Sequence, residues 1–343
     1  MSIRGVIRAK NELLTRITLR LPEYPGLGEY KGHIRHTSKW DSSFDPVGKT
    51  IAVIGNGASG IQVLPQLQKV AKRIDHFARS RTWIFESFGS EKRSDQPVFF
   101  TEEQLKSFED DLTYYHFRKN LENGFYKNFF RIFSESEKHQ AARKDIIQRM
   151  AARLQKKPDL LESILPDFPP FCRRPTPGPG YLEALTEDNV NYISTPIQKF
   201  TETGIVTIDG VARDVDAIIC ATGANVDFAP AFPIVANGID LNKAWKPDGE
   251  YTSPYSYFGV TAPYFPNLFF SVGPNSFGLS GTLNHSVETV LTYIAKALRK
   301  MTAQGIKTMA PSKAATDDFV EYIDAFFAQT VLSENCSSWY NGK

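Results

Sequence analysis

Three glycines carry the clearest chemical signal in the sequence, because Gly55, Gly57 and Gly60 are spaced as G-N-G-A-S-G. In this pattern the first glycine makes a tight turn, the second lets the backbone approach a pyrophosphate, and the third lets a helix pack closely on a strand. The N–H groups that follow face an anion along the positive end of the helix dipole. The predicted contacts with a dinucleotide are Gly55, Asn56, Gly57, Ala58, Ser59, Gly60 and the side chain of Gln62.

The residues after the next expected strand indicate which dinucleotide binds. An NAD site places an acidic residue there for the ribose 2′-hydroxyl, whereas an NADP site places a cation for the 2′-phosphate. Here the strand ends in Arg79, Ser80 and Arg81, and Asp75 lies inside the strand, too early in position. We therefore predict NADPH, with Arg79 and Ser80 at its 2′-phosphate.

The elements that must position this turn follow from the hydrophobic pattern. Residues Lys49 to Gly55 form a short β-branched run, and Ala58 to about Val70 has apolar residues at helical spacing. Arg73 to Ala78 then has the composition of a second strand. This order predicts a right-handed βαβ unit of a parallel sheet.

The rest of the chain alternates helical and strand-like stretches. Residues 86–170 carry charged and aromatic helices, for example Glu137 to Gln155, and are predicted to form a helical insertion. Pro166 to Gly180 is too rich in proline for a helix or a strand interior and is predicted to be a loop. Further strands are expected at 204–208, 216–220 and 268–272, the last followed by a helix with Val287, Val290, Leu291, Ile294 and Leu298 on one side.

Composition excludes several classes of function. The formal net charge of +2, from 40 basic and 38 acidic side chains, gives no field for holding nucleic acid. No apolar stretch approaches the roughly 20 residues that a membrane span needs, and no export signal is visible. The three cysteines and six histidines show no metal-site spacing, and the odd cysteine count favours a reducing, cytoplasmic location.

A second motif precedes the glycine turn. Tyr30 to Trp40, YKGHIRHTSKW, matches the pattern FxGxxxHxxxW with Gly32, His36 and Trp40 in place and tyrosine instead of phenylalanine. This resembles the fingerprint of the Baeyer-Villiger monooxygenases, although Asp41 stands where that family tends to have proline. His36 and Trp40 are assigned a structural role in coupling domain movement. Three later segments are similar to the same family: DAIICATG at 216–223, PNLFFSVGPN at 266–275 and CRRPTPGPGYLEAL at 172–185.

The resemblance implies an enzyme that uses FAD and NADPH to insert one atom of O2 next to a ketone carbonyl, giving an ester or lactone. It implies that Arg173 helps to hold the NADPH 2′-phosphate and that Arg174 is the catalytic arginine beside the flavin. A guanidinium suits anionic states in a dry site, because it is always charged and has several donors. Thr222, Gly223 and Asn275 fall in the segments similar to the cofactor-contacting regions. Fungal members look most similar, which suggests secondary metabolite biosynthesis.

The expected fold is α/β, with a Rossmann-like NADPH-binding domain that carries the helical insertion and an incomplete FAD-binding domain. The expected boundaries are 1–45 for an N-terminal segment and linker, 46–215 for the NADPH domain and 216–343 for the C-terminal part of the FAD domain. Family members hold FAD through a GxGxxG motif separate from the one for NADPH. This chain has a single GxGxxG motif, the one assigned to NADPH. The sequence therefore predicts that a further N-terminal FAD-binding portion is needed.

Several alternatives stay open. The chain could be a truncated, catalytically impaired NADPH-binding remnant or a partner subunit, or an N- or S-oxygenating flavin monooxygenase. A flavin-free NADPH reductase is disfavoured because no Tyr-x-x-x-Lys pair stands near the glycine turn. A hydrolase is disfavoured because the sequence has no GxSxG elbow.

Overall fold

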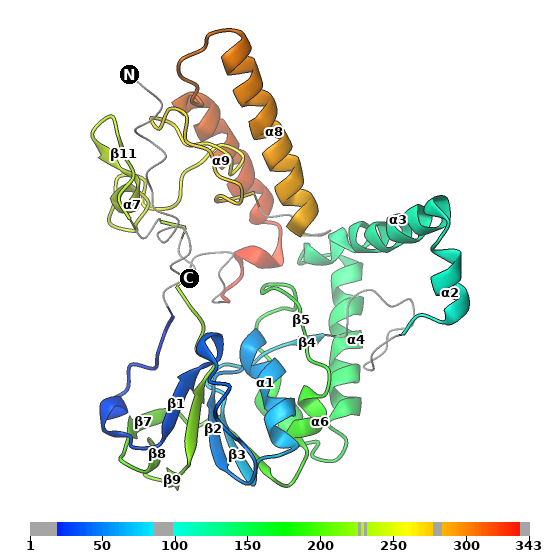
Figure 1. Ribbon diagram of the computed structural model, residues 1–343, viewed down its shortest axis with the longest axis vertical. Helices are drawn as coiled ribbons and strands as arrows, with labels where there is room; N and C mark the ends of the chain where they lie inside the picture. Colours follow the sequence, from blue (N-terminus) through cyan, green and yellow to red (C-terminus); the bar gives the residue numbers. More distant parts are fainter. Residues whose placement is uncertain (1–18, 86–98, 226–227, 230–231, 277–282, 337–343) are drawn as a thin grey trace. The chain divides into compact units, whose positions relative to one another are not determined.

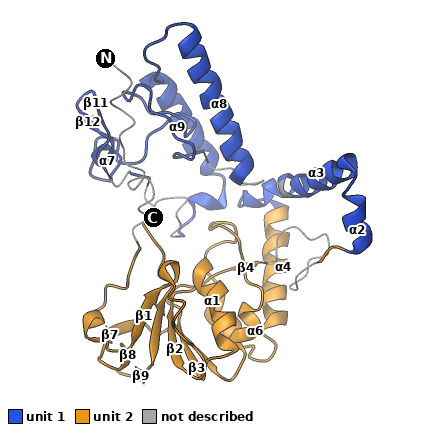
Figure 2. Cartoon of the chain, viewed as in Figure 1, with its two compact units in different colours: residues 1–16, 101–136, 226–343 blue, residues 17–100, 137–225 orange. Residues whose placement is uncertain are grey.

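The computed structural model describes residues 19–85, 99–225, 228–229, 232–276 and 283–336. The chain forms two compact units, shown in Figure 2. Unit 1 comprises residues 1–16, 101–136 and 226–343, and unit 2 comprises residues 17–100 and 137–225. Each unit is therefore assembled from segments that are far apart in the sequence.

A five-stranded parallel sheet forms the centre of unit 2, in the order β1-β10-β2-β3-β6 (Figure 1). The three inner strands are almost entirely buried, as expected for a parallel sheet with both faces covered. This arrangement confirms the predicted α/β, Rossmann-like fold. The strands are β1 (His33–His36), β2 (Thr50–Ile54), β3 (Arg73–Phe77), β6 (Val190–Ile193) and β10 (Ala217–Cys220).

Helix α1 (Ala58–Gln68) makes the crossover from β2 to β3. Its residues Ile61, Leu64 and Leu67 are buried in the core cluster that also contains Ile51 and Ile74 of the two strands. The predicted βαβ unit is thus confirmed, and the helix ends two residues before Val70.

The remaining elements of unit 2 surround this sheet. Helix α4 and helix α6 pack in the same core cluster as α1, through Met150 and Leu182. A small antiparallel sheet, β7-β8-β9, packs its buried residues with the other face of the parallel sheet. These elements are β4 (Ile84–Phe85), α4 (Glu137–Arg153), α5 (Leu160–Ile164), β5 (Thr176–Pro177), α6 (Tyr181–Leu185), β7 (Ile197–Phe200), β8 (Gly204–Thr207) and β9 (Ala212–Asp214), with 3-10 turns η2 (Leu27–Glu29) and η3 (Thr37–Lys39).

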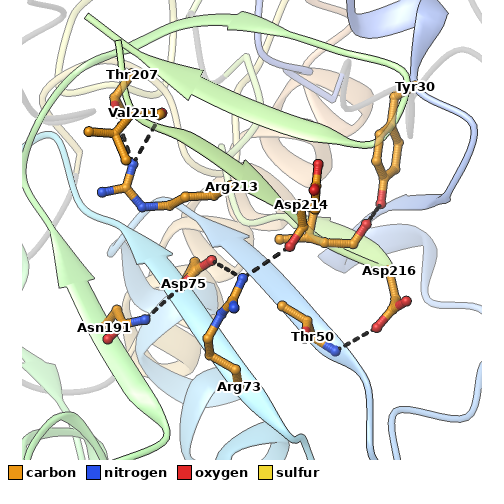
Figure 3. Close-up of polar contacts among 11 residues, drawn as sticks. Tyr30, Thr50, Arg73, Asp75, Asn191, Thr207, Val211, Arg213, Asp214 and Asp216 are labelled. Carbon is orange, nitrogen blue, oxygen red and sulfur yellow. Dashed lines mark hydrogen bonds and ion pairs between the residues drawn. The ribbon is translucent and has the colours of Figure 1, made fainter. Parts of the chain in front are cut away.

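A polar cluster joins the two sheets of unit 2 (Figure 3). Arg73 donates from one guanidinium nitrogen to Asp75 at 3.1 Å and to the carbonyl of Asp214 at 3.0 Å. Asp75 is 1% exposed and also accepts a hydrogen bond from Asn191 at 2.8 Å. Because its charge is paired and its oxygens accept two hydrogen bonds, Asp75 can remain buried.

Unit 1 is mainly helical in its described part. The predicted helix near the C-terminus is confirmed as α8 (Leu283–Ala303). Aromatic residues of α9 contact the η4 segment, as in the stacking of Phe326 with Phe129 at 6.4 Å between ring centroids. The elements are α2 (Glu102–Ser107), α3 (Asp111–Lys127), η4 (Phe129–Ile132), β11 (Val235–Ala236), β12 (Ile239–Asp240), α7 (Leu241–Ala244), α8, α9 (Lys313–Phe327) and η5 (Val331–Ser333).

One strand prediction is wrong. The apolar run 268–272 forms a single bridge, between Phe269 and Thr261, and no ladder. The segment facing it turns sharply, since Phe258 and Gly259 have φ angles of 51° and 64°. A ladder requires two extended neighbours, and this turn removes one of them.

The compact units divide the chain at other positions than the sequence-based boundaries. Strand β10 was expected in the flavin part, but it pairs in parallel with both β1 and β2 and so lies inside the sheet of unit 2. The expected helical insertion is also divided, because residues 101–136 belong to unit 1 and residues 137–170 to unit 2. Its residues 86–98 lie outside the described part of the chain. The cofactor that each part binds stays a prediction.

Candidate nucleotide-binding site

The glycine turn has the geometry that its sequence predicts. Gly55 has a φ of 102°, and a Cβ placed there would lie 2.6 Å from the carbonyl oxygen of Ala221. A Cβ on Gly60 would lie 2.0 Å from the carbonyl oxygen of Gly55. A Cβ on Gly57 would meet nothing within 4 Å. Gly55 and Gly60 are therefore required by the fold, whereas Gly57 leaves open space beside the backbone.

Helix α1 begins directly after this turn, so its first N–H groups lie beside that space. Its first internal hydrogen bond runs from the N–H of Ile61 to the carbonyl of Gly57, at 3.0 Å. The N–H groups of Ala58, Ser59 and Gly60 precede it, and helix geometry leaves such groups without intrahelical partners. Together with the helix dipole they make a site suited to a pyrophosphate.

Two of the predicted contact residues, Asn56 and Gln62, donate side-chain hydrogen bonds to backbone carbonyls of the protein. Asn56 is 7% exposed and donates from Nδ2 to the carbonyl of Ser80 at 2.6 Å, which ties the turn to the end of β3. Gln62 is exposed and donates from Nε2 to the carbonyl of Ala58 at 2.9 Å. Asn56 thus shapes the turn, and Gln62 lies on the first turn of the helix.

The predicted 2′-phosphate residues lie at the same edge of the sheet as the glycine turn. Strand β3 ends at Phe77, whose carbonyl accepts a hydrogen bond from the N–H of Gly55 at 2.9 Å. Arg79 and Ser80 follow, and Arg79 is exposed. Asp75 lies earlier in the strand and pairs with Arg73 in the polar cluster, so it does not lie at the strand end. The cation rather than the carboxylate is therefore available at the strand end.

Arg173 lies on an aromatic platform, the ring of Phe168, which no pattern in the sequence indicates. Its guanidinium carbon is 4.5 Å from the centre of the Phe168 ring, and Trp83 Nε1 donates to the carbonyl of Phe168 at 2.9 Å. Burial lowers the pKa of Arg173. Its Nε atom is buried and has no hydrogen-bond partner among the described residues, so an anionic ligand would suit this side chain. Proline-rich loops carry no periodicity that would reveal Phe168.

Arg174 is exposed, and strand pairing places its loop beside the end of β3. Strands β4 and β5 are parallel, with Ile84 opposite Thr176. The stretch from Arg79 to Arg81 leads into β4, and the pair Arg173 and Arg174 leads into β5. The two predicted basic segments are therefore brought together within unit 2.

The predicted turn at Thr222 and Gly223 adjoins the glycine turn through Ala221. Gly223 has a φ of 80°, and its carbonyl accepts hydrogen bonds from His36 Nε2 at 3.0 Å and from the N–H of Arg20 at 2.9 Å. The Thr222 hydroxyl donates to the carbonyl of Arg20. Asn275, by contrast, belongs to unit 1, where it is exposed with a φ of 64°.

A buried imidazole holds helix α6 to the sheet below this site. His76 Nδ1 contacts the carbonyl of Val53 at 3.2 Å, and its Nε2 contacts the Tyr181 hydroxyl at 2.9 Å. Desolvation by burial lowers the pKa of His76 to about 4, although the hydrogen bond to Val53 opposes this. The ring is thus neutral at pH 7, with Nδ1 donating to the carbonyl and Nε2 accepting from the tyrosine.

The described residues contain no helix with the length and apolar content needed to cross a membrane. They also contain no group of three or more His, Cys, Asp or Glu side chains that could hold a metal ion.

The chain is similar in sequence to proteins named as monooxygenases. The chain is 33% identical over 327 residues to the FAD-binding monooxygenase tazF of Aspergillus terreus, covering 94% of this chain and 57% of that protein. It is 30% identical over 334 residues to a Baeyer-Villiger monooxygenase of Pseudomonas aeruginosa, covering 94% of this chain and 60% of that protein. The chain thus spans less than two thirds of these relatives' length.

The fold is also shared with solved structures. A crystal structure of OTEMO in complex with FAD and NADP matches with a TM-score of 0.76 and 22% identity, covering 94% of this chain and 66% of that one. No family model matches the sequence.

Proposed function

We propose that unit 2 binds NADPH for a flavin-dependent oxygenation, because the chain is similar in sequence to FAD-binding monooxygenases and shares its fold with a structure solved with FAD and NADP. The observation that carries the proposal is the glycine turn at the start of α1, where Gly57 leaves open space beside three N–H groups that helix geometry leaves without intrahelical partners. Among the described residues, no atom lies within 4 Å of a Cβ placed on Gly57, and the pyrophosphate of a dinucleotide fits the chemistry of this space.

In this proposal the basic side chains select the phosphorylated cofactor. The N–H groups of Ala58, Ser59 and Gly60 bind the pyrophosphate, while Arg79, Ser80 and Arg173 bind the 2′-phosphate. The Phe168 platform keeps the Arg173 guanidinium in place, and the partly buried surroundings strengthen its attraction to an anion. NADPH, when bound, supplies a hydride.

We further propose that the reaction inserts one oxygen atom of O2 beside a ketone carbonyl, to give an ester or lactone in secondary metabolism. Arg174 is proposed as the catalytic residue. Its side chain is exposed and has a fixed positive charge, so it can stabilise negative charge on the reacting atoms without a proton transfer. A cytoplasmic location is proposed with this function.

FAD, when bound, supplies the oxygen chemistry, and we propose that Thr222 and Gly223 of unit 2 contact it, while a flavin contact of Asn275 in unit 1 stays a prediction. The sequence has one GxGxxG segment, and the NADPH site uses it. A portion with a second glycine turn would therefore complete the flavin site.

A flavin and turnover assay tests the proposal. The protein is mixed with FAD, and its visible spectrum and NADPH consumption are recorded with and without ketones. Retained flavin and ketone-stimulated NADPH oxidation that yields an ester support the proposed function. Stimulation by amines or sulfides supports the N- or S-oxygenating alternative instead. NADPH binding without any turnover or flavin supports the remnant or partner-subunit alternative.

A further inference from the structure

The last residue of helix α4 reaches the loop that carries the two predicted basic site residues. Arg153 is held against Glu183 by a two-pronged ion pair, with Nε 2.7 Å from Oε1 and the terminal nitrogen 2.8 Å from Oε2. The same terminal nitrogen donates to the carbonyl of Gly178 at 2.6 Å. Only 9% of the Arg153 side chain is exposed. A fork of this kind fixes the guanidinium in one orientation.

The loop at Gly178 has little room to move. The N–H of Gly178 donates to the carbonyl of Phe85 at 3.4 Å. A Cβ on Gly178 would lie 2.9 Å from Ile84 Cγ2 and 3.1 Å from Ile61 Cγ2. Gly178 is thus wedged between strand β4 and helix α1, whose start forms the nucleotide site, while Arg153 holds its carbonyl.

The chain between Gly178 and Arg174 is stiff. Pro175 and Pro177 lie between these two residues, Pro177 as the second residue of β5, and Pro179 follows Gly178 directly. Each proline fixes its own φ angle and restricts the residue before it. A displacement at Gly178 is therefore passed along the loop to Arg174 and Arg173 instead of being absorbed by bond rotation.

We propose that Arg153 is a positioning residue for the cofactor site, because its contacts with Gly178 and Glu183 fix the loop that carries Arg173 and Arg174. This inference rests on the proposed function, in which Arg173 binds the 2′-phosphate of NADPH. Arg153 acts through the loop and touches no cofactor itself.

The neighbouring ion pair provides a matched control. Lys156 follows the same helix and lies 3.0 Å from Glu187, with both side chains well exposed at 68% and 42%. Its contact is with the far end of the α6 segment and not with Gly178. Lys156→Met removes one lysine charge from the same region without releasing the loop.

The test measures how strongly each protein prefers NADPH to NADH. Calorimetry gives the two dissociation constants for the wild type, Arg153→Met, Glu183→Gln, Arg173→Ala and Lys156→Met. We expect Arg153→Met to lower the preference for NADPH roughly tenfold, since a misplaced Arg173 loses the 2′-phosphate but not the rest of the nucleotide. Lys156→Met stays within about twofold of the wild type.

Glu183→Gln provides a second, milder variant because its side chain is 47% exposed and its loss leaves Arg153 able to reach Gly178. We expect it to shift the preference in the same direction by a smaller factor. The positioning role is overturned if Arg153→Met and Glu183→Gln both keep the wild-type preference for NADPH while Arg173→Ala loses it. That outcome leaves the proposed function standing. A wild type that binds NADPH and NADH equally overturns the proposed function itself.

Discussion

His36 Nε2 lies 3.0 Å from the carbonyl oxygen of Gly223, although 187 residues separate them in the sequence. His36 Nδ1 accepts a hydrogen bond from the N–H of Ser38 at 3.2 Å. Since Nδ1 accepts, Nε2 donates to the carbonyl of Gly223. The imidazole links strand β1 to the turn after strand β10, close to where the chain leaves unit 2 at Asn225.

We expect His36→Ala to destabilise unit 2 by roughly 1 to 3 kcal/mol, because the Gly223 carbonyl and the Ser38 N–H each lose a buried partner. Urea unfolding followed by circular dichroism measures this loss. His36→Gln keeps a donor of similar reach and should recover part of the stability. An unchanged unfolding midpoint for His36→Ala would show that the contact does not hold the turn.

Stability should fall as the pH is lowered from about 6.5 towards 4, because of His76. Burial lowers its pKa from 6.5 to about 4 in the folded protein, so the unfolded chain binds more protons in this range. The stability that the neutral ring contributes is complete above pH 6.5 and is lost towards pH 4. Between pH 7 and pH 5 the loss amounts to about 2 kcal/mol.

Urea unfolding of the wild type and of His76→Gln at the two pH values isolates this effect. We expect the variant to be less stable at pH 7 and to depend less on pH. His116→Gln changes an exposed histidine and serves as the control. Equal pH dependence in the wild type and His76→Gln would assign the effect to other groups.

Gly57→Ala should weaken NADPH binding without weakening the fold. Gly57 has a φ of −73°, which alanine adopts freely, and an added Cβ would meet no atom within 4 Å. The methyl group would occupy the space proposed for the pyrophosphate, so we expect the dissociation constant for NADPH to rise at least about tenfold.

The melting temperature of Gly57→Ala should stay near that of the wild type. Gly60→Ala is the contrasting variant, because its Cβ would lie 2.0 Å from the Gly55 carbonyl oxygen, and we expect it to unfold at a lower temperature. Wild-type NADPH affinity in a folded Gly57→Ala protein would place the nucleotide elsewhere.

Arg174→Met should abolish oxygenation while NADPH binding remains. Arg174 is exposed, so its loss leaves no buried charge and the protein should fold normally. Loss of a charge that stabilises the reacting atoms lowers turnover by about 100-fold or more. Oxygenation is measured as ester formation from a ketone, with FAD and any flavin-binding portion present. NADPH binding is measured separately by calorimetry. Full activity of Arg174→Met would remove this arginine from the chemistry.

The sequence by itself determined the glycine turn, the helix after it and the strands on either side. These features depend on near neighbours, since Gly55 needs a positive φ and the β-branched run of β2 favours an extended chain. The same local rules predicted α4, β8 and β10 to within a few residues, and they predicted a helix where α8 lies.

Only the tertiary structure decided which distant segments meet. It placed β10 between β1 and β2, laid Phe168 under Arg173, and brought Arg153 to Gly178. It also left 268–272 without a ladder, because the segment opposite turns at Gly259. Such contacts depend on the shape and the hydrogen-bonding groups of remote parts of the chain. The local periodicity of the sequence does not indicate which remote segment supplies them.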